Sequence, residues 1–197
     1  MAMGRPKNFS REEVLEKAIV LFWHRGFADT SLQDLEKATG VNKSGLYSEF
    51  RDKNDIFLAS LRHYLANRDL SALFCDPPGL QNIAIFFHEA LLCTDGPKGC
   101  LAVNSLRELA VVPGEAREII SRSQTQLKRG FARNINAAGG ARKKVKSTVQ
   151  AIDVEGLAEL TMTFYIGISL EQNLRHKKTV AATRKKIDGL LALLSRA

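Results

Sequence analysis

Residues that begin and end helices recur at short intervals through the first third of the chain. Ser10 followed by Glu13 has the spacing of a capping box, in which a hydroxyl and a carboxylate each accept a hydrogen bond from a backbone amide. Apolar residues then recur at every third or fourth position as far as Gly26, where this helix is expected to end. Further helix starts are expected at Thr30 or Ser31, at Asn42 and at Asp52. This spacing predicts four consecutive short helices.

The interval between the second and third of these helices is the most restrictive part of the pattern. Thr39-Gly40-Val41 leaves room only for a tight turn, and Gly40 tolerates the positive φ that such a turn requires. Two short helices joined in this way form a helix-turn-helix motif. The second helix of such a motif is a recognition helix, which enters the major groove of DNA with its N-terminal residues. Here those residues are Lys43, Ser44, Tyr47 and Ser48.

The remainder of the chain is also expected to be helical. The segment Cys75–Gly79 is a break, and no stretch alternates convincingly enough to predict a strand. Helices are expected over residues 80–94, 100–111, 115–136, 153–174 and 180–195. The predicted fold is therefore all-α with about nine helices. It divides into a DNA-binding domain over residues 1–53 and a helical domain over residues 54–197.

The formal net charge of +8 has an uneven origin. Residues 119–152 contain eight basic and no acidic side chains, and the rest of the chain is balanced. A nucleic-acid surface therefore cannot be located from the net charge alone. The basic run at residues 142–146 is expected to be a solvated loop, with contacts to an acidic ligand or to DNA phosphates as the alternative.

Cysteine and histidine placement gives no sign of a metal or disulfide framework. The three cysteines, Cys75, Cys93 and Cys100, are an odd number without CxxC spacing, which fits a reducing cytoplasm. His63, His88 and His176 are far apart in the sequence and have no spacing typical of metal ligands. The sequence shows no secretory signal and no apolar run long enough to cross a membrane. It also shows no catalytic triad and no phosphate-binding glycine loop, so neither an enzyme nor a cofactor is expected. We expect the cysteines to be small buried side chains. A thiol- or metal-responsive sensor, in which Cys93 and Cys100 approach each other, stays open as the alternative.

Between Phe9 and about Leu61 the sequence resembles the TetR family of bacterial transcriptional regulators. The resemblance rests on an ordered set of positions in and between the four predicted helices. These are Gly26, Thr30, Ser31, Leu35, Gly40, Val41, Leu46, Tyr47, Phe50 and Lys53. Two shorter segments, residues 98–105 and Gly167-Ile168-Ser169, also look like parts of this family.

The resemblance implies a homodimer that binds a palindromic operator in double-stranded DNA, usually as a repressor released by a small ligand. An activator of the same fold is an alternative. The hydroxyl of Tyr47 and the ammonium of Lys53 would contact phosphates, and Lys43 is suited to a guanine edge. The full set of implied DNA contacts is Arg5, Lys7, Thr30, Ser31, Lys43, Ser44, Gly45, Tyr47, Ser48 and Lys53.

A ligand pocket and a dimer interface are expected in the second domain. Ligand pockets are mostly apolar with a few polar groups, although core packing explains the same residues equally well. The candidates are Phe86, Phe87, Leu91, Leu101, Asn104, Met162, Phe164 and Tyr165. The dimer is expected to form through helices at about 153–174 and 180–195. A two-fold dimer places two recognition helices about one DNA turn (~34 Å) apart, as a palindrome requires.

Overall fold

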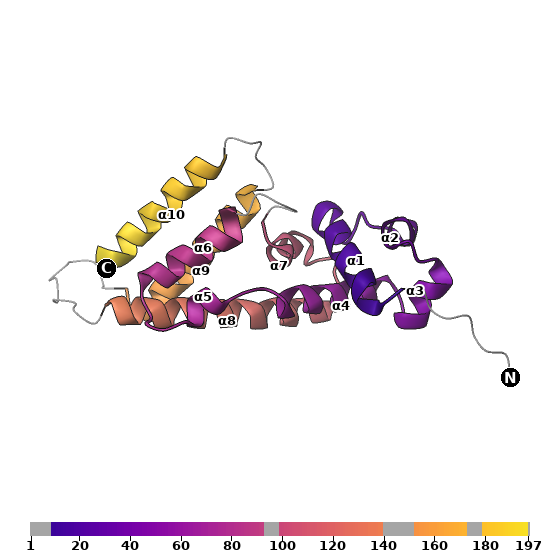
Figure 1. Cartoon of the computed structure of the whole chain (residues 1–197), viewed down its shortest axis with the longest axis horizontal. Helices are drawn as coiled ribbons and strands as arrows, with labels where there is room; N and C mark the ends of the chain where they lie inside the picture. The colour runs from indigo at the N-terminus through magenta and orange to yellow at the C-terminus, as the bar shows by residue number, and fades with distance from the viewer. Residues whose placement is uncertain (1–8, 93–98, 140–151, 173–178, 197) are drawn as a thin grey trace. The chain divides into compact units, whose positions relative to one another are not determined.

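A computed structural model describes residues 9–92, 99–139, 152–172 and 179–196 (Figure 1). Regular structure in these ranges is entirely helical, which confirms the predicted all-α class. The α-helices are α1 (Arg11–Arg25), α2 (Leu32–Thr39), α3 (Lys43–Glu49), α4 (Lys53–Ala66), α5 (Ser71–Phe74), α6 (Leu80–Leu92), α7 (Leu101–Ser105), α8 (Gly114–Ala138), α9 (Val154–Gln172) and α10 (Thr179–Arg196). A short 3-10 helix, η1 (Leu106–Glu108), follows α7. None of these helices combines the length and apolar character needed to cross a membrane.

The chain forms two compact units by internal contacts. Unit 1 comprises Met1–Arg68 together with Asn104–Ile119, and unit 2 comprises Asp69–Val103 together with Ile120–Ala197. Unit 1 therefore combines α1–α4 with a second stretch of chain that contains η1. The functional division at residue 53 remains a prediction.

The helix ends of unit 1 follow the predicted caps. Ser10 and Glu13 form the capping box of α1, and Gly26 ends that helix with φ 83°. Ser31, the second of the two candidates, is the N-cap of α2, and Gly40 ends α2 in the left-handed conformation. Asn42 and Asp52 cap the third and fourth helices, where each side chain accepts a hydrogen bond from the backbone. Local sequence thus specifies where these helices begin and end.

The core of unit 1 lies between α1 and α4, with α2 packed against α1 and α3 against α2. The rings of Phe22 and Phe57 meet edge to face at 5.1 Å between centroids. Leu35 of α2 and Leu46 of α3 are both fully buried, so each short helix is held by one deep apolar side chain. Apolar burial therefore fixes the short helices onto the longer pair.

The prediction of one helix over residues 100–111 is wrong. The chain there forms α7, then η1, and then a turn before α8 begins at Gly114. The physical reason is a tertiary contact, because Glu108 at the end of η1 accepts hydrogen bonds from backbone amides 80 residues earlier. Helix α5 was also not predicted, since four residues are too few to produce a periodic apolar pattern.

Unit 2 has an aromatic core to which α6, α8 and α9 contribute. Phe87 of α6 and Phe131 of α8 stack at 5.9 Å with an interplanar angle of 4°. Phe87 also meets Phe164 of α9 edge to face at 5.5 Å. Phe86 contacts Phe131 and Tyr165, each at 5.5 Å. Such ring pairs add to the free energy gained from burial, so this cluster stabilises unit 2.

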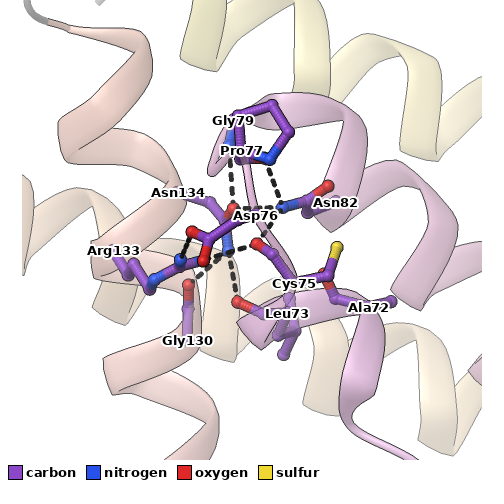
Figure 2. Close-up of polar contacts among 10 residues, drawn as sticks. All are labelled: Ala72, Leu73, Cys75, Asp76, Pro77, Gly79, Asn82, Gly130, Arg133 and Asn134. Carbon is purple, nitrogen blue, oxygen red and sulfur yellow. Dashed lines mark hydrogen bonds and ion pairs between the residues drawn. The ribbon is translucent and has the colours of Figure 1, made fainter.

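A buried polar network joins α8 to the segment between α5 and α6 (Figure 2). The Asn134 side chain, with no exposed surface, donates to the carbonyls of Leu73 and Gly130, each at 2.8 Å. Its Oδ1 accepts from the Gly79 amide at 2.9 Å and from Asn82 Nδ2 at 3.0 Å. All four hydrogen-bonding positions of the amide are therefore used, as burial of such a group requires.

Candidate nucleic-acid interface

Helix α3 presents the residues that the sequence predicts to contact DNA. Lys43, Ser44, Tyr47 and Ser48 are all exposed, and Tyr47 is 41% exposed as a residue. The Lys43 ammonium lies 5.8 Å from the centroid of the Tyr47 ring. The structure thus brings a cation, a phenol and two hydroxyls together on one exposed face. These are the groups that bind base edges and phosphates.

The N-terminal end of α3 is held in place by neighbouring side chains. Asn42 Oδ1 accepts from the Gly45 amide at 2.9 Å, and the Glu36 carboxylate of α2 accepts from the Lys43 amide. At Gly45 a Cβ would come within 2.6 Å of Val41 Cγ1 and 3.3 Å of Phe9 Cε1. Gly45 is therefore required by packing inside the protein, and a role in close approach to DNA stays a prediction.

Thr30 and Ser31 lie at the start of α2 and differ in exposure. Ser31 is exposed, and its hydroxyl accepts from the Asp34 amide and donates to the Asp34 carboxylate. Thr30 is 1% exposed, and its hydroxyl donates to the Gly26 carbonyl at 2.6 Å. The Ser31 hydroxyl thus lies at the surface, whereas the Thr30 hydroxyl is used inside the turn.

Asp34 is held in its charged form. Hydrogen bonds from the Ser31 side chain and backbone, together with the positive charge of nearby Arg25, lower the pKa of Asp34 from 3.8 to about 2. The Arg25 guanidinium lies 2.7 Å from the carboxylate. This ion pair offsets a negative charge in the first turn of α2, next to the residues predicted to meet the DNA backbone.

Lys53 uses much of its hydrogen-bonding capacity inside the protein. Its ammonium donates to the carbonyls of Phe27 and Thr30, each at 3.0 Å, and lies 4.2 Å from the Phe27 ring centroid. An ammonium has three protons, so one remains for the predicted phosphate contact. That contact stays a prediction.

Glu108 is a residue of this region that sequence reasoning missed. Its carboxylate accepts from the amide of Phe27 at 2.8 Å and from the amide of Ala28 at 3.0 Å. These partners are about 80 positions apart in the sequence, so no local spacing rule connects them. The only local signal is Gly26, whose predicted role as a helix end gives no information about a distant partner.

Several charges of unit 1 are paired within the unit. Arg11 donates to the Glu49 carbonyl at 2.5 Å and lies 3.9 Å from the Glu49 carboxylate, which offsets the one acidic charge on α3. Arg51 pairs with Asp55 at 3.6 Å. Arg5 and Lys7, predicted to enter a minor groove, lie outside the described residues.

The residues predicted to line a ligand pocket are largely packed against each other. Phe86, Phe87, Leu101, Met162 and Tyr165 are at most 5% exposed, and Phe164 is half-buried. The four aromatic residues of this set belong to the aromatic core, which supports the packing interpretation for them, and ligand contact stays a prediction. Leu91 lies on α6, but its side chain is outside the described part. Asn104 is half-buried and belongs to unit 1.

An open groove of about 480 Å³ lies elsewhere, between α1 and α4 of unit 1. It shares no residue with the predicted pocket, and most of its lining residues have polar or charged side chains. The lining residues are Glu12, Glu16, Ile19, His63, Tyr64, Asn67 and Arg68.

The cysteines differ in accessibility. Cys75 is exposed and Cys100 is buried, whereas Cys93 lies outside the described residues. Within the ranges that the structure covers, no three His, Cys, Asp or Glu side chains are grouped so as to hold a metal ion. The thiol-sensor alternative stays a prediction, because Cys93, one of the two cysteines that it needs, lies outside the described residues.

Comparison with known proteins identifies relatives of this chain by sequence and by structure. The sequence profile of the bacterial regulatory proteins of the tetR family matches residues 14–60. ComR, an HTH-type transcriptional repressor of Escherichia coli (strain K12), is 37% identical over 119 residues, or 57% of each chain. YezE, an uncharacterised HTH-type transcriptional regulator of Bacillus subtilis (strain 168), is 32% identical over 135 residues, covering 66% of this chain and 70% of YezE.

Solved structures agree with these relatives. CifR, a TetR family transcriptional regulator whose cysteine mutant is complexed with 26-bp double-strand operator DNA, superimposes with a TM-score of 0.74. The two proteins are 25% identical, and the match covers 98% of this chain and 99% of CifR. The likeness to ComR spans little more than half of that protein, whereas the likeness to CifR extends over nearly the whole chain.

Proposed function

The chain belongs to the TetR family of DNA-binding transcriptional regulators, and on that basis we propose that it is a ligand-released repressor that binds a palindromic operator as a homodimer. Its curated relatives regulate transcription and several are repressors. Members of such a family bind DNA and catalyse no reaction, so the functional question concerns which DNA and which ligand. As a DNA-binding regulator of a bacterial type, the protein acts in the cytoplasm.

The observation that carries this proposal is the exposed face of α3, which buried and capping contacts hold in place. Leu46 and the capping contacts of Asn42 and Glu36 hold the helix, while Lys43 and Tyr47 point to solvent. In this proposal Lys43 hydrogen-bonds a guanine edge and the Tyr47 hydroxyl binds a phosphate. Ser44, Ser48 and Ser31 contribute hydroxyl contacts to the backbone or bases.

Dimerisation is proposed to use α9 and α10. Both helices carry large apolar side chains at the surface, with Leu160 51% and Leu193 67% exposed. Each helix also has a glycine, Gly167 or Gly189, with open space where a Cβ would stand. Exposed apolar side chains beside small residues favour close packing against a second copy of the same helices.

Release by a ligand is proposed to occur through a shift between two dimer states. A ligand can favour the released state only by binding it more tightly than the DNA-bound state. We place an apolar ligand among the rings of unit 2, where it would contact them only after rings that now pack against each other move apart. Opening such a cluster requires rearranging Phe87 or Phe164.

Selection of binding sites from random duplex DNA tests the proposal. The purified protein is incubated with the library at ~150 mM salt, because affinity for DNA depends strongly on ionic strength. We expect enrichment of one inverted repeat, and the Lys43→Ala variant should enrich an altered repeat. Enrichment of a single half-site would argue against a dimer. An absence of enrichment, also after unfolding and refolding without ligand, would contradict DNA reading.

A further inference from the structure

The turn between α1 and α2 is held through its backbone by two oppositely charged side chains. Lys53 of α4 binds its carbonyls, at Phe27 and Thr30. Glu108 of η1 binds its amides, at Phe27 and Ala28. The two side chains therefore fix both faces of one short segment. We call the Glu108 contact to Phe27 and Ala28 the turn clamp.

The backbone at Gly26 shows that the turn is shaped around this carboxylate. Gly26 has φ 83° and ψ 176°, a conformation that is essentially restricted to glycine. A Cβ at this position would lie 2.6 Å from Glu108 Oε2 and 2.8 Å from Oε1. The carboxylate thus occupies the space that any side chain at residue 26 would need, and two charge-assisted hydrogen bonds hold it there.

The clamped segment leads directly into the DNA-facing part of the protein. Ala28 is three residues before Ser31, the N-cap of α2, and α2 carries α3 through the Gly40 turn. A displacement of the turn would therefore move the start of α2 and, with it, the recognition helix. Positioning errors of this kind weaken contacts that depend on geometry, although the contacting residues themselves are unchanged.

We propose that Glu108 is a positioning residue for operator binding, which holds the α1–α2 turn so that α2 and α3 meet DNA in register. This proposal rests on the proposed function. Glu108 is delivered by η1, immediately after α7, and not by the four helices that form the rest of the reading head. It acts through the backbone of the turn and makes no contact with DNA in this proposal.

The direction of the change in operator affinity distinguishes a positioning role of Glu108 from a general effect of its negative charge. Removing an acidic side chain from a DNA-binding protein strengthens its attraction to the polyanion. We expect the opposite for Glu108→Ala and Glu108→Gln, with operator affinity about tenfold lower for Ala and partly retained for Gln. Glutamine keeps one oxygen acceptor and the shape of the side chain.

Glu115→Gln is the matched control. Glu115 lies in the same stretch of unit 1, and its carboxylate pairs with Arg62 at 2.9 Å on the surface. It makes no contact with the turn clamp, so its variant removes the same charge without releasing the turn. Its operator affinity should be unchanged or slightly higher than that of the wild type.

The experiment combines operator affinity, measured with the repeat enriched by the wild type, with hydrogen exchange at the amides of Phe27 and Ala28. Faster exchange at these amides together with weaker binding, at unchanged helix content, is the expected result. Unchanged exchange would show that the turn clamp is not formed. Faster exchange with unchanged affinity would also overturn the proposal, because the turn would then be irrelevant to DNA reading.

Two further outcomes are distinguishable. Should Glu108→Ala fail to fold, the same criteria apply to Glu108→Gln, which leaves a side chain of the same size at the turn. If the wild type and Glu115→Gln both enriched no repeat, the proposed function itself would be contradicted. Loss in the Glu108 variants alone supports positioning by the turn clamp.

Discussion

The two units of this protein both have an apolar core and differ in where their polar contacts lie. Unit 1 adds to its core a series of side-chain contacts to the backbone, with caps at Ser10, Ser31, Asn42 and Asp52 and with Lys53 and Glu108 at one turn. Unit 2 depends on a cluster of aromatic rings and on the buried amide of Asn134. The comparison teaches that polar contacts in the reading head set helix ends and one turn, whereas those in unit 2 converge on one buried amide beside the aromatic core.

The largest effect is expected in the aromatic core. Phe87→Ala should lower the free energy of unfolding by about 3–5 kcal/mol, because the ring is fully buried and its loss leaves a cavity. Phe74→Ala is the control, since that ring is 42% exposed and should cost about 1 kcal/mol. Urea unfolding at a fixed protein concentration measures both. A small loss at Phe87 would mean that its ring lines a site and does not pack.

The second-largest effect on stability is expected at the buried amide of Asn134. Asn134→Leu should cost about 3 kcal/mol in the free energy of unfolding, because it leaves the Gly79 amide and the Leu73 carbonyl without their partner. Asn136→Leu on the same helix is exposed and should change stability by less than about 0.5 kcal/mol. Equal effects of the two substitutions would contradict the view that unit 2 depends on this network.

Backbone geometry in unit 1 is tested by two glycines. Gly26→Ala should cost about 2–3 kcal/mol, because its conformation is strained for alanine and its Cβ meets Glu108. Gly40→Ala should cost about 1 kcal/mol, since its φ of 74° is left-handed but its surroundings are open. Thermal unfolding of both variants checks the order. If Gly40→Ala were the more damaging, the contact with Glu108 would not contribute.

These glycines also show how far sequence reasoning reached. Gly26 and Gly40 were predicted as helix ends from local spacing, and the capping rules act over only three or four residues. Glu108 was missed because its partners are far away in the sequence, and the same contact ended the helix predicted over residues 100–111. The aromatic residues of unit 2 were placed on the correct helices, but periodicity does not distinguish a packed ring from one that faces a ligand.

DNA reading by α3 is tested by two substitutions of smaller effect. Lys43→Ala should reduce discrimination at one base position by about 1–2 kcal/mol, because a base-edge hydrogen bond is lost. Tyr47→Phe should weaken binding to all sequences by about 1 kcal/mol, since a phosphate contact carries no sequence information. Competition binding against a panel of single-base variants separates the two. An unchanged base preference in Lys43→Ala would argue against base reading by this residue.

The smallest effect is expected at acidic pH. The pKa of Asp34 is lowered to about 2 by hydrogen bonds from Ser31, so this carboxylate stabilises the folded state above the unfolded pKa near 4. That contribution is lost as the pH falls from about 4 towards 2. The stability difference between the wild type and Asp34→Asn should therefore vanish near pH 2.

NMR titration of Ser31→Ala is the sharper form of this test. Without the hydroxyl, the pKa of Asp34 should rise towards 3.8, because the largest cause of the shift is removed. The Arg25 ion pair remains in this variant and should keep the pKa from returning fully. An unchanged pKa would assign the shift to Arg25 and not to the cap.

Unit 1 is discontinuous in the sequence, and this has a consequence for protein engineering. A chimera that transfers the reading head to another regulator by a single cut after α4 would include the Phe27 and Ala28 amides but leave their acceptor behind. A graft that also carries residues 104–119 keeps Glu108 with its partners. The part of such a protein that can be exchanged is therefore a pair of segments. A cut chosen from the helix-turn-helix motif alone separates these two segments.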